Sequence, residues 1–279
     1  MIDIKNNLVV QDIFNNIEYY IDLFLEQGIL IFKGLNPTKE QEMDLMYALE
    51  NRIGWSTYHA WRDEDHAKTF ERHARFISKE ELFIPWHLEH VEKENYQTGA
   101  IWHMLKYDCS NDCGQTGFVN MVDLFQTMSD DWKKFLLGCK VSSLAESDSD
   151  GMMHKINFND NLRQRDLVIP HNVTGKLIYR PNFTPEEVLR TVNGRAPLGE
   201  DILLYDQIID WTKEQVCRDS PNQFWFKWDV GDTIIIDLSV MAHAVKGGFN
   251  LGERNFSRIW AYRNPFVDPA IGKNHSSSQ

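Results

Sequence analysis

Short apolar segments recur along the whole chain, and they constrain its fold more than any other feature of the sequence. Glycine or small groups of polar residues follow them, as expected for buried β-strands that end in turns. Alternation and apolar runs of this kind predict strands at residues 29–32, 99–105, 176–179, 223–228, 233–237 and 255–262.

Several segments between these strands have helical spacing. Residues 11–27 carry apolar side chains on one face, and Gly28 is a suitable stop signal. Other helices are expected after Thr38, which forms a capping box with Gln41, and after the cap residue Ser129. We also expect helices at residues 200–217 and from the Thr-Pro-Glu-Glu segment at 184–187.

The chain of 279 residues contains no internal repeat and no low-complexity linker, and 42% of its residues are hydrophobic. This composition supports a packed core rather than disorder. We therefore expect one domain at residues 1–266, built from a multi-stranded β core with helices on its outside, and a polar tail at residues 267–279.

The net charge of −12 argues against nucleic-acid binding, which depends on Lys and Arg neutralising phosphates. No apolar run approaches the roughly 20 residues that span a bilayer, so no membrane association is expected. Four cysteines, without a second pair at metal-ligand spacing, are typical of reduced thiols in a cytoplasmic protein: Cys109, Cys113, Cys139 and Cys217.

The segment Trp86-His87-Leu88-Glu89 carries the most specific chemical signal. In an extended strand, alternate side chains share a face, so His87 and Glu89 are expected to project together. With a second imidazole from far downstream, for which His243 is the candidate, they would form a two-histidine, one-carboxylate facial triad. Such a triad holds Fe(II) and leaves positions for a co-substrate and dioxygen.

Further landmarks follow in a fixed order, and together they resemble those of a known family. They are Trp86-His87-x-Glu89, Gly114-x-Thr116-x-Phe118-x-Asn120-Met121, Asn182-Phe183-Thr184, Trp228-x-x-Gly231-Asp232, His243, Arg254 and Arg258. The chain resembles the taurine dioxygenase/TfdA-like family of Fe(II)/2-oxoglutarate-dependent dioxygenases from about Ile13 to Phe266. The resemblance implies a mainly β fold with a double-stranded β-helix (jelly-roll) core and flanking helices.

The same resemblance implies roles for individual residues. It assigns Fe(II) to His87, Glu89 and His243. It assigns the distal carboxylate of 2-oxoglutarate to Arg254 and Thr116, and substrate or co-substrate contact to Arg258. The sequence is consistent with the arginine assignments, because Arg254 and Arg258 have the same strand parity, and a guanidinium offers the two-point fork that suits a carboxylate.

The implied reaction is oxidation of a C–H bond by dioxygen, by hydroxylation or another oxidation, with release of succinate and CO2 from 2-oxoglutarate. A glutamate ligand is typical of clavaminate synthase-like relatives, whereas the arginine spacing resembles the taurine branch. The substrate is therefore expected to be a small polar or anionic molecule, such as an amino acid or a sulfonate. Candidate substrate contacts are Tyr58, His59, Arg62 and Arg258, the first three in a polar segment that suits either a lid or a solvated helix.

Two other functions fit parts of the sequence. A zinc hydrolase could use the same His/Glu/His ligands, and a non-catalytic jelly-roll binding protein could keep the scaffold alone. Neither explains why Thr116 and Arg254 accompany the triad. His90 has the strand parity of Leu88 and is expected to point away from the iron, whereas the histidines at positions 103, 154 and 171 lack a triad partner at strand spacing. We expect all four to be structural or solvated. Assembly into homo-oligomers is left open.

Overall fold

Two β-sheets form the centre of the protein, and the larger one is 7-stranded. The computed structural model describes residues 4–53, 55–57, 62–65, 81–89, 97–109, 113–143, 145–147, 153–155, 164–183, 187–250 and 252–263. In the large sheet, β16 lies between β2 and β6, and β6 is also paired with β18. Its strands are β1 (Ile4–Asn6), β2 (Ile29–Lys33), β16 (Thr233–Asp237), β6 (Gln97–Tyr107), β18 (Arg254–Arg263), β3 (Trp55–Thr57) and β4 (Arg62–Asp65).

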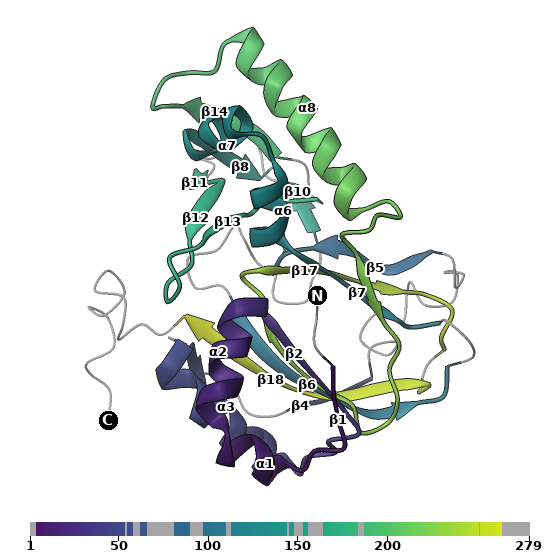
Figure 1. The fold of residues 1–279 in the computed structure, drawn as a ribbon. Helices are drawn as coiled ribbons and strands as arrows, with labels where there is room; N and C mark the ends of the chain where they lie inside the picture. The colour runs from purple at the N-terminus through teal and green to yellow at the C-terminus, as the bar shows by residue number, and fades with distance from the viewer. Residues whose placement is uncertain are drawn as a thin grey trace, which may run out of the picture.

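The smaller sheet is 4-stranded and antiparallel, in the order β15 (Phe224–Phe226), β7 (Thr116–Asn120), β17 (Met241–Lys246) and β5 (Leu82–His87). Along the chain, β5, β6 and β7 alternate between the small and the large sheet, and so do β15, β16, β17 and β18. This alternation is consistent with the predicted jelly-roll core. The predicted mainly β fold with flanking helices is therefore confirmed (Figure 1).

Both faces of the large sheet are buried, and this explains its continuous apolar strands. One face packs toward the small sheet, with Ile31 and Ile236 in the same core cluster as Phe118 of β7. The other face packs on helices, with Phe32 and Ile235 in a second cluster. Alternate residues of one strand thus enter different cores, as the pleat requires.

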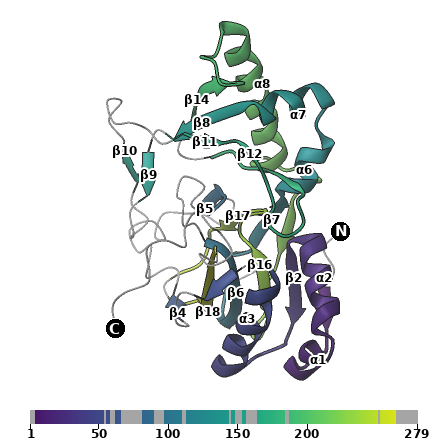
Figure 2. The same cartoon turned by 90° about the vertical axis from the view of Figure 1, so that its left-hand side faces the viewer.

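Three helices cover this second face: α1 (Val10–Asn15), α2 (Ile17–Gln27) and α3 (Lys39–Ile53), with α2 and α3 beside the large sheet in both views (Figures 1 and 2). The single helix predicted at 11–27 is wrong in one respect. The chain leaves helical geometry at Asn16, whose φ is −126° and ψ 31°. The side-chain amide of Asn16 donates a hydrogen bond to the backbone carbonyl of Asp12 and so caps the end of α1. Gly28 does end α2, with a φ of +74°.

The chain between β7 and β15 forms most of the upper part of Figure 1. Ser129 caps α7 as predicted, because its hydroxyl accepts a hydrogen bond from the backbone N–H of Trp132. Glu187 begins a strand rather than extending the expected helix, whose first residues 184–186 lie outside the described residues. The elements of this part are α6 (Met121–Thr127), α7 (Asp130–Leu137), β8 (Cys139–Ser143), β9 (Ala145–Ser147), β10 (Met153–Lys155), β11 (Arg165–Asp166), β12 (Val168–Pro170), β13 (Leu177–Tyr179), β14 (Glu187–Val192) and α8 (Gly199–Val216).

Within the described ranges, no helix combines the length and the apolar character that crossing a membrane requires. The tail at 267–279 lies outside the described residues, as does the boundary at 266. The single domain, the tail and the cytoplasmic location therefore stay predictions.

Candidate active site

Two histidines meet where β5 and β17 pair at one edge of the small sheet. His87 is the last residue of β5 and lies directly opposite His243 of β17. Opposite residues of an antiparallel pair have neighbouring side chains, and the two imidazole centroids are 4.1 Å apart. Strand pairing therefore brings together two side chains that are far apart in the sequence.

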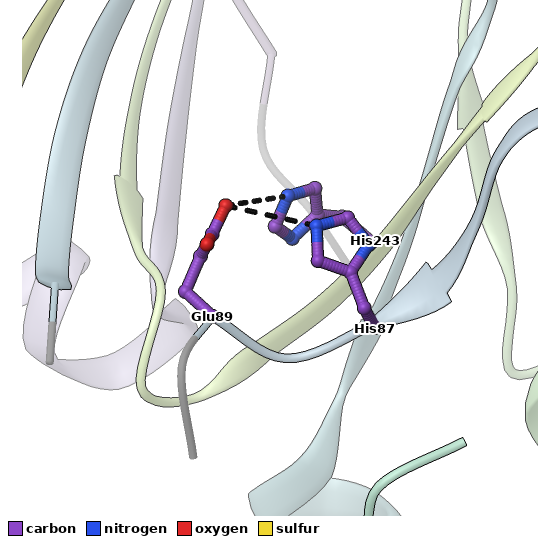
Figure 3. Close-up of side chains that lie close together, drawn as sticks. All are labelled: His87, Glu89 and His243. Atoms are coloured by element: carbon purple, nitrogen blue, oxygen red, sulfur yellow. Dashed lines mark ion pairs between the residues drawn. The ribbon is translucent and has the colours of Figure 1, made fainter. Parts of the chain in front are cut away.

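Glu89 joins this pair, but not through the predicted strand geometry. β5 ends at His87, and Glu89 lies in a turn beyond it. The carboxylate Oε1 of Glu89 is 3.6 Å from Nε2 of His87 and 3.7 Å from Nε2 of His243 (Figure 3). The expectation that His87 and Glu89 share the face of one strand is thus wrong. The turn after the strand, rather than the pleat, brings the carboxylate to the imidazoles.

The geometry of the three side chains suits a metal ion. Their ligand atoms all lie within 4.8 Å of one another, and no other group of three or more His, Cys, Asp or Glu residues in the described part of the chain meets this condition. Ligands at right angles around one ion, with bonds of about 2.0–2.2 Å, are about 3 Å apart. The observed separations of 3.6 and 3.7 Å are close to this value and exceed those of good hydrogen bonds. Two imidazoles and one carboxylate are the donor set of non-haem Fe(II) sites.

Backbone carbonyl groups orient both imidazole rings. Nδ1 of His87 is 2.9 Å from the carbonyl oxygen of Pro85, and Nδ1 of His243 is 3.4 Å from that of Met241. Because a carbonyl oxygen can only accept, each Nδ1 carries the proton in these bonds. Each Nε2 then faces Glu89, and such a hydrogen bond to Nδ1 is what fixes the ring of a metal-binding histidine.

The surroundings shift the pKa values of the two rings in opposite directions. Burial lowers the pKa of His243 to about 3, and the charge of His87 acts in the same direction. Burial also favours the neutral form of His87, but the hydrogen bond to Glu89 and its negative charge outweigh burial and raise the pKa of His87. His243 is therefore neutral at physiological pH, which is the form that coordinates metals.

A second polar cluster surrounds Arg254, the first residue of β18, which is only 2% exposed. Its Nε donates to the carbonyl oxygen of Gly114 at 3.2 Å, and its Nη2 donates to the hydroxyl of Thr116 at 3.1 Å. Burial lowers the pKa of Arg254 to about 10, which still leaves the side chain charged at neutral pH. A guanidinium fixed in this way is a suitable fork for a carboxylate.

The position of Gly114 depends on its having no side chain. Its φ is +62°, and a Cβ there would lie 3.2 Å from Cδ of Arg254 and 3.3 Å from the ring of Phe249. The same ring lies beside the guanidinium, with 5.7 Å between its centroid and Cζ of Arg254. Gly114 therefore allows its backbone to approach Arg254 closely enough to accept a hydrogen bond.

Arg258 lies on the same face of β18 as Arg254, as strand parity predicted. The ring of Phe256 stands between them, 5.1 Å from Cζ of Arg254 and 5.8 Å from Cζ of Arg258. Arg258 also stacks on Trp260, with Cζ 4.0 Å from the ring centroid. On β6, Trp102 is directly opposite Arg258, and its ring is 5.4 Å from that of His243. Trp102 thus connects the surroundings of Arg258 to the histidine pair.

The structure describes almost nothing of the other three predicted substrate contacts. Tyr58 and His59 lie outside the described residues. Arg62 belongs to β4, and its backbone pairs directly opposite Arg258, but its side chain lies outside the described residues. The roles of Tyr58, His59 and Arg62 therefore stay predictions.

The remaining histidines have different surroundings. His103 is buried, and its Nδ1 lies 2.7 Å from Oε1 of Glu42 on α3. His171 bonds to Asp237 at 2.9 Å. The structural role expected of these two histidines agrees with these contacts. His90 and the side chain of His154 lie outside the described residues.

Sequence reasoning gave no role to Trp228, although it belongs to the landmarks of the resemblance. It is 1% exposed, and its indole N–H donates to the hydroxyl of Thr116 at 2.8 Å. The two residues are far apart in the sequence, and β7 does not pair with the segment that follows β15. No spacing or periodicity in the sequence could have revealed this contact.

The mainly β fold carries a two-histidine, one-carboxylate cluster, which is the donor set of non-haem Fe(II) oxygenases. Residues 11–260 match the family model described as taurine catabolism dioxygenase TauD, TfdA family, and the chain belongs to this family. The predicted enzyme class and cofactors are thereby confirmed: the chain is an oxidoreductase that uses Fe(II) and 2-oxoglutarate.

Solved structures show the same fold. A taurine dioxygenase from Burkholderia xenovorans has a TM-score of 0.62 and 14% identity, over 89% of this chain and 82% of that chain. AAD-2 in complex with Mn(II) and N-oxalylglycine has a TM-score of 0.60 and 13% identity, over 89% of this chain and 87% of that chain. No curated protein matches the sequence.

Proposed function

We propose that the chain oxidises a C–H bond of a small polar or anionic molecule, with 2-oxoglutarate and dioxygen as co-substrates. The observation that carries the proposal is the convergence of His87, Glu89 and His243 within 4.8 Å of one another. In the balanced reaction, one oxygen atom of dioxygen enters the substrate, and the other enters the succinate that forms from 2-oxoglutarate together with CO2. Fe(II) supplies this oxidative chemistry when it is bound.

The chain's own residues hold the iron and keep its ligands in place. We assign Nε2 of His87, Nε2 of His243 and a carboxylate oxygen of Glu89 as the ligands. The carbonyl groups of Pro85 and Met241 keep the imidazoles in the tautomer that exposes Nε2. Because β5 and β17 are paired at His87 and His243, the two rings keep a fixed separation before any ion binds.

Arg254 and Thr116 are assigned to the distal carboxylate of 2-oxoglutarate. Arg254 is buried, charged and fixed by Gly114 and Thr116, so a carboxylate would offset the cost of burying its charge. Arg258 is assigned to an anionic group of the substrate or co-substrate, since it lies on the same strand face and its plane is stacked on Trp260.

Arg258 and one structural neighbour support the proposed substrate class. One structural neighbour is a taurine dioxygenase, and taurine is a sulfonate. An arginine fork suits a sulfonate or a carboxylate equally well. We therefore propose small sulfonates, amino acids and other carboxylates as the first compounds to test.

The test is substrate-dependent release of succinate. Protein loaded anaerobically with Fe(II) is mixed with 2-oxoglutarate, air-saturated buffer and each compound, and succinate and oxidised product are quantified. A compound that raises succinate release and yields product in equal amount supports the proposal. His243→Ala should release none above background. If no compound in these classes stimulates wild-type succinate release, the proposed substrate class is wrong.

A zinc hydrolase, the other function expected of the same three ligands, has no support from the family that the chain matches. A hydrolase gives no reason for a buried arginine that donates a hydrogen bond to a buried threonine hydroxyl. Arg254→Ala separates the two functions. It should weaken 2-oxoglutarate binding in the proposed oxygenase, whereas a hydrolase would lack such binding in wild type as well.

A further inference from the structure

The hydroxyl of Thr116 is held by two donors at once. Trp228 Nε1 is 2.8 Å from Thr116 Oγ1, and Arg254 Nη2 is 3.1 Å from the same oxygen. All three side chains are buried, with exposures of 1% for Thr116, 1% for Trp228 and 2% for Arg254. Water therefore does not compete for these bonds, and their geometry decides what Thr116 can offer a ligand.

The number of donors and acceptors settles the direction of the threonine proton. A threonine hydroxyl has one proton to donate and two lone pairs that accept. An indole N–H can only donate, and so can a guanidinium. Trp228 and Arg254 thus occupy both lone pairs of Thr116, and neither can accept its proton. The proton has to point toward a third group that accepts.

We infer that Trp228 is a positioning residue for co-substrate binding: by occupying a lone pair of Thr116, it reserves the hydroxyl proton for the distal carboxylate of 2-oxoglutarate. This inference rests on the proposed function. Without the indole N–H, the hydroxyl is free to rotate its proton into the vacated direction. Thr116 would then lose part of its value as a donor, although its side chain is unchanged.

Trp228 is itself fixed by packing. Its ring contacts that of Phe226 edge to face, with 5.0 Å between the centroids. Phe226 in turn lies directly opposite Thr116 in the pairing of β15 with β7. The indole is therefore held against the strand that carries Thr116, and its N–H is directed at the hydroxyl before a ligand enters.

The test is a double-mutant cycle on 2-oxoglutarate affinity, measured by calorimetry on Mn(II)-loaded protein so that no turnover occurs. The variants are Trp228→Phe, Thr116→Val and the double variant. Thr116→Val should weaken binding about tenfold, the value of a hydrogen bond to a charged group. Trp228→Phe should weaken it about three- to fivefold in wild type and leave it unchanged in the Thr116→Val background.

A ligand without the distal carboxylate distinguishes an orienting role of Trp228 from a packing role. 2-Oxopentanoate has a methyl group where 2-oxoglutarate has its distal carboxylate, so neither Trp228→Phe nor Thr116→Val should alter its affinity. Trp225→Phe is the matched control, because Trp225 donates to Gln223 rather than to Thr116. It should leave the affinity for both ligands unchanged. If Trp228→Phe fails to fold, Trp228→3-benzothienylalanine removes the N–H while preserving the ring system.

The outcomes distinguish this inference from the function on which it rests. Coupling between positions 228 and 116, confined to 2-oxoglutarate, supports the inference. Equal losses from Trp228→Phe in both backgrounds, or equal losses for 2-oxopentanoate, would show that Trp228 acts by packing alone and would overturn it. Failure of the wild-type protein to bind Mn(II) and 2-oxoglutarate would instead refute the proposed function.

Discussion

Gly114→Ala should weaken 2-oxoglutarate binding although position 114 has no side chain to contact any ligand. Gly114 has a φ of +62°, and an added Cβ would lie 3.2 Å from Cδ of Arg254, 3.3 Å from Sγ of Cys109 and 3.3 Å from Phe249. These separations are tighter than ordinary van der Waals contact. Arg254 must therefore shift by a few tenths of an ångström, or the backbone of Gly114 must move away from it.

Two terms set the magnitude. A left-handed backbone costs a residue with a Cβ about 1–2 kcal/mol, which should appear as lost stability. A shift of Arg254 should cost one of its charge-assisted bonds to 2-oxoglutarate, about 1.5 kcal/mol, which corresponds to about a tenfold higher dissociation constant. The first term concerns folding, and the second concerns binding.

Gly252→Ala is the matched control, because it should lower stability through its left-handed backbone without moving Arg254. Gly252 has a φ of +79° and stands two residues before Arg254, but nothing lies within 4 Å of an added Cβ. Urea unfolding should show similar losses for both variants, while calorimetry on the Mn(II)-loaded proteins should show weaker 2-oxoglutarate binding for Gly114→Ala alone. Equal affinities for the two variants would refute the crowding argument.

Two further predictions concern stability. His103→Ala should lower the free energy of unfolding by about 3 kcal/mol, because it leaves the buried carboxylate of Glu42 without its imidazole partner. Urea titrations measure this loss, and a loss below about 1 kcal/mol would contradict this account. The hydrogen bond from Arg195 lowers the pKa of Asp201, so this carboxylate stabilises the fold above its unfolded-state pKa, and the contribution disappears as pH falls through its lower folded-state pKa. Asp201→Asn should therefore reduce the loss of stability on acidification, and an unchanged pH profile would refute the assignment.

Much of the fold could be predicted from local pattern. The apolar runs at Ile29–Lys33 and Thr233–Asp237 are strands because both faces of the large sheet are buried. The break at Asn16 was missed because the apolar face continues across it, whereas the side-chain amide of Asn16 caps the end of α1. Glu187 was misassigned because helix-start residues precede it, whereas its segment pairs with β8 over Glu187–Val192. Tertiary pairing overrides local propensity at such positions.

The candidate site, like the fold, could be predicted only in part. The family landmarks named His87, Glu89 and His243, and all three lie together in the structure. The strand argument for Glu89 failed because periodicity does not reveal where β5 ends. The contact between Trp228 and Thr116 could not be predicted, since it depends on how β15 and the chain after it pack against β7. Sequence patterns thus indicate ligand types, whereas hydrogen-bond direction requires the three-dimensional arrangement.

The most direct test of the central claim is the visible absorption of the protein after anaerobic addition of Fe(II) and 2-oxoglutarate. If His87, Glu89 and His243 share one ferrous ion, the chelated 2-oxo acid should give a weak charge-transfer band, and His243→Ala should abolish it. The absence of a band in the wild-type protein, together with tight zinc binding, would contradict the claim. So would a band of full intensity in the His243→Ala variant.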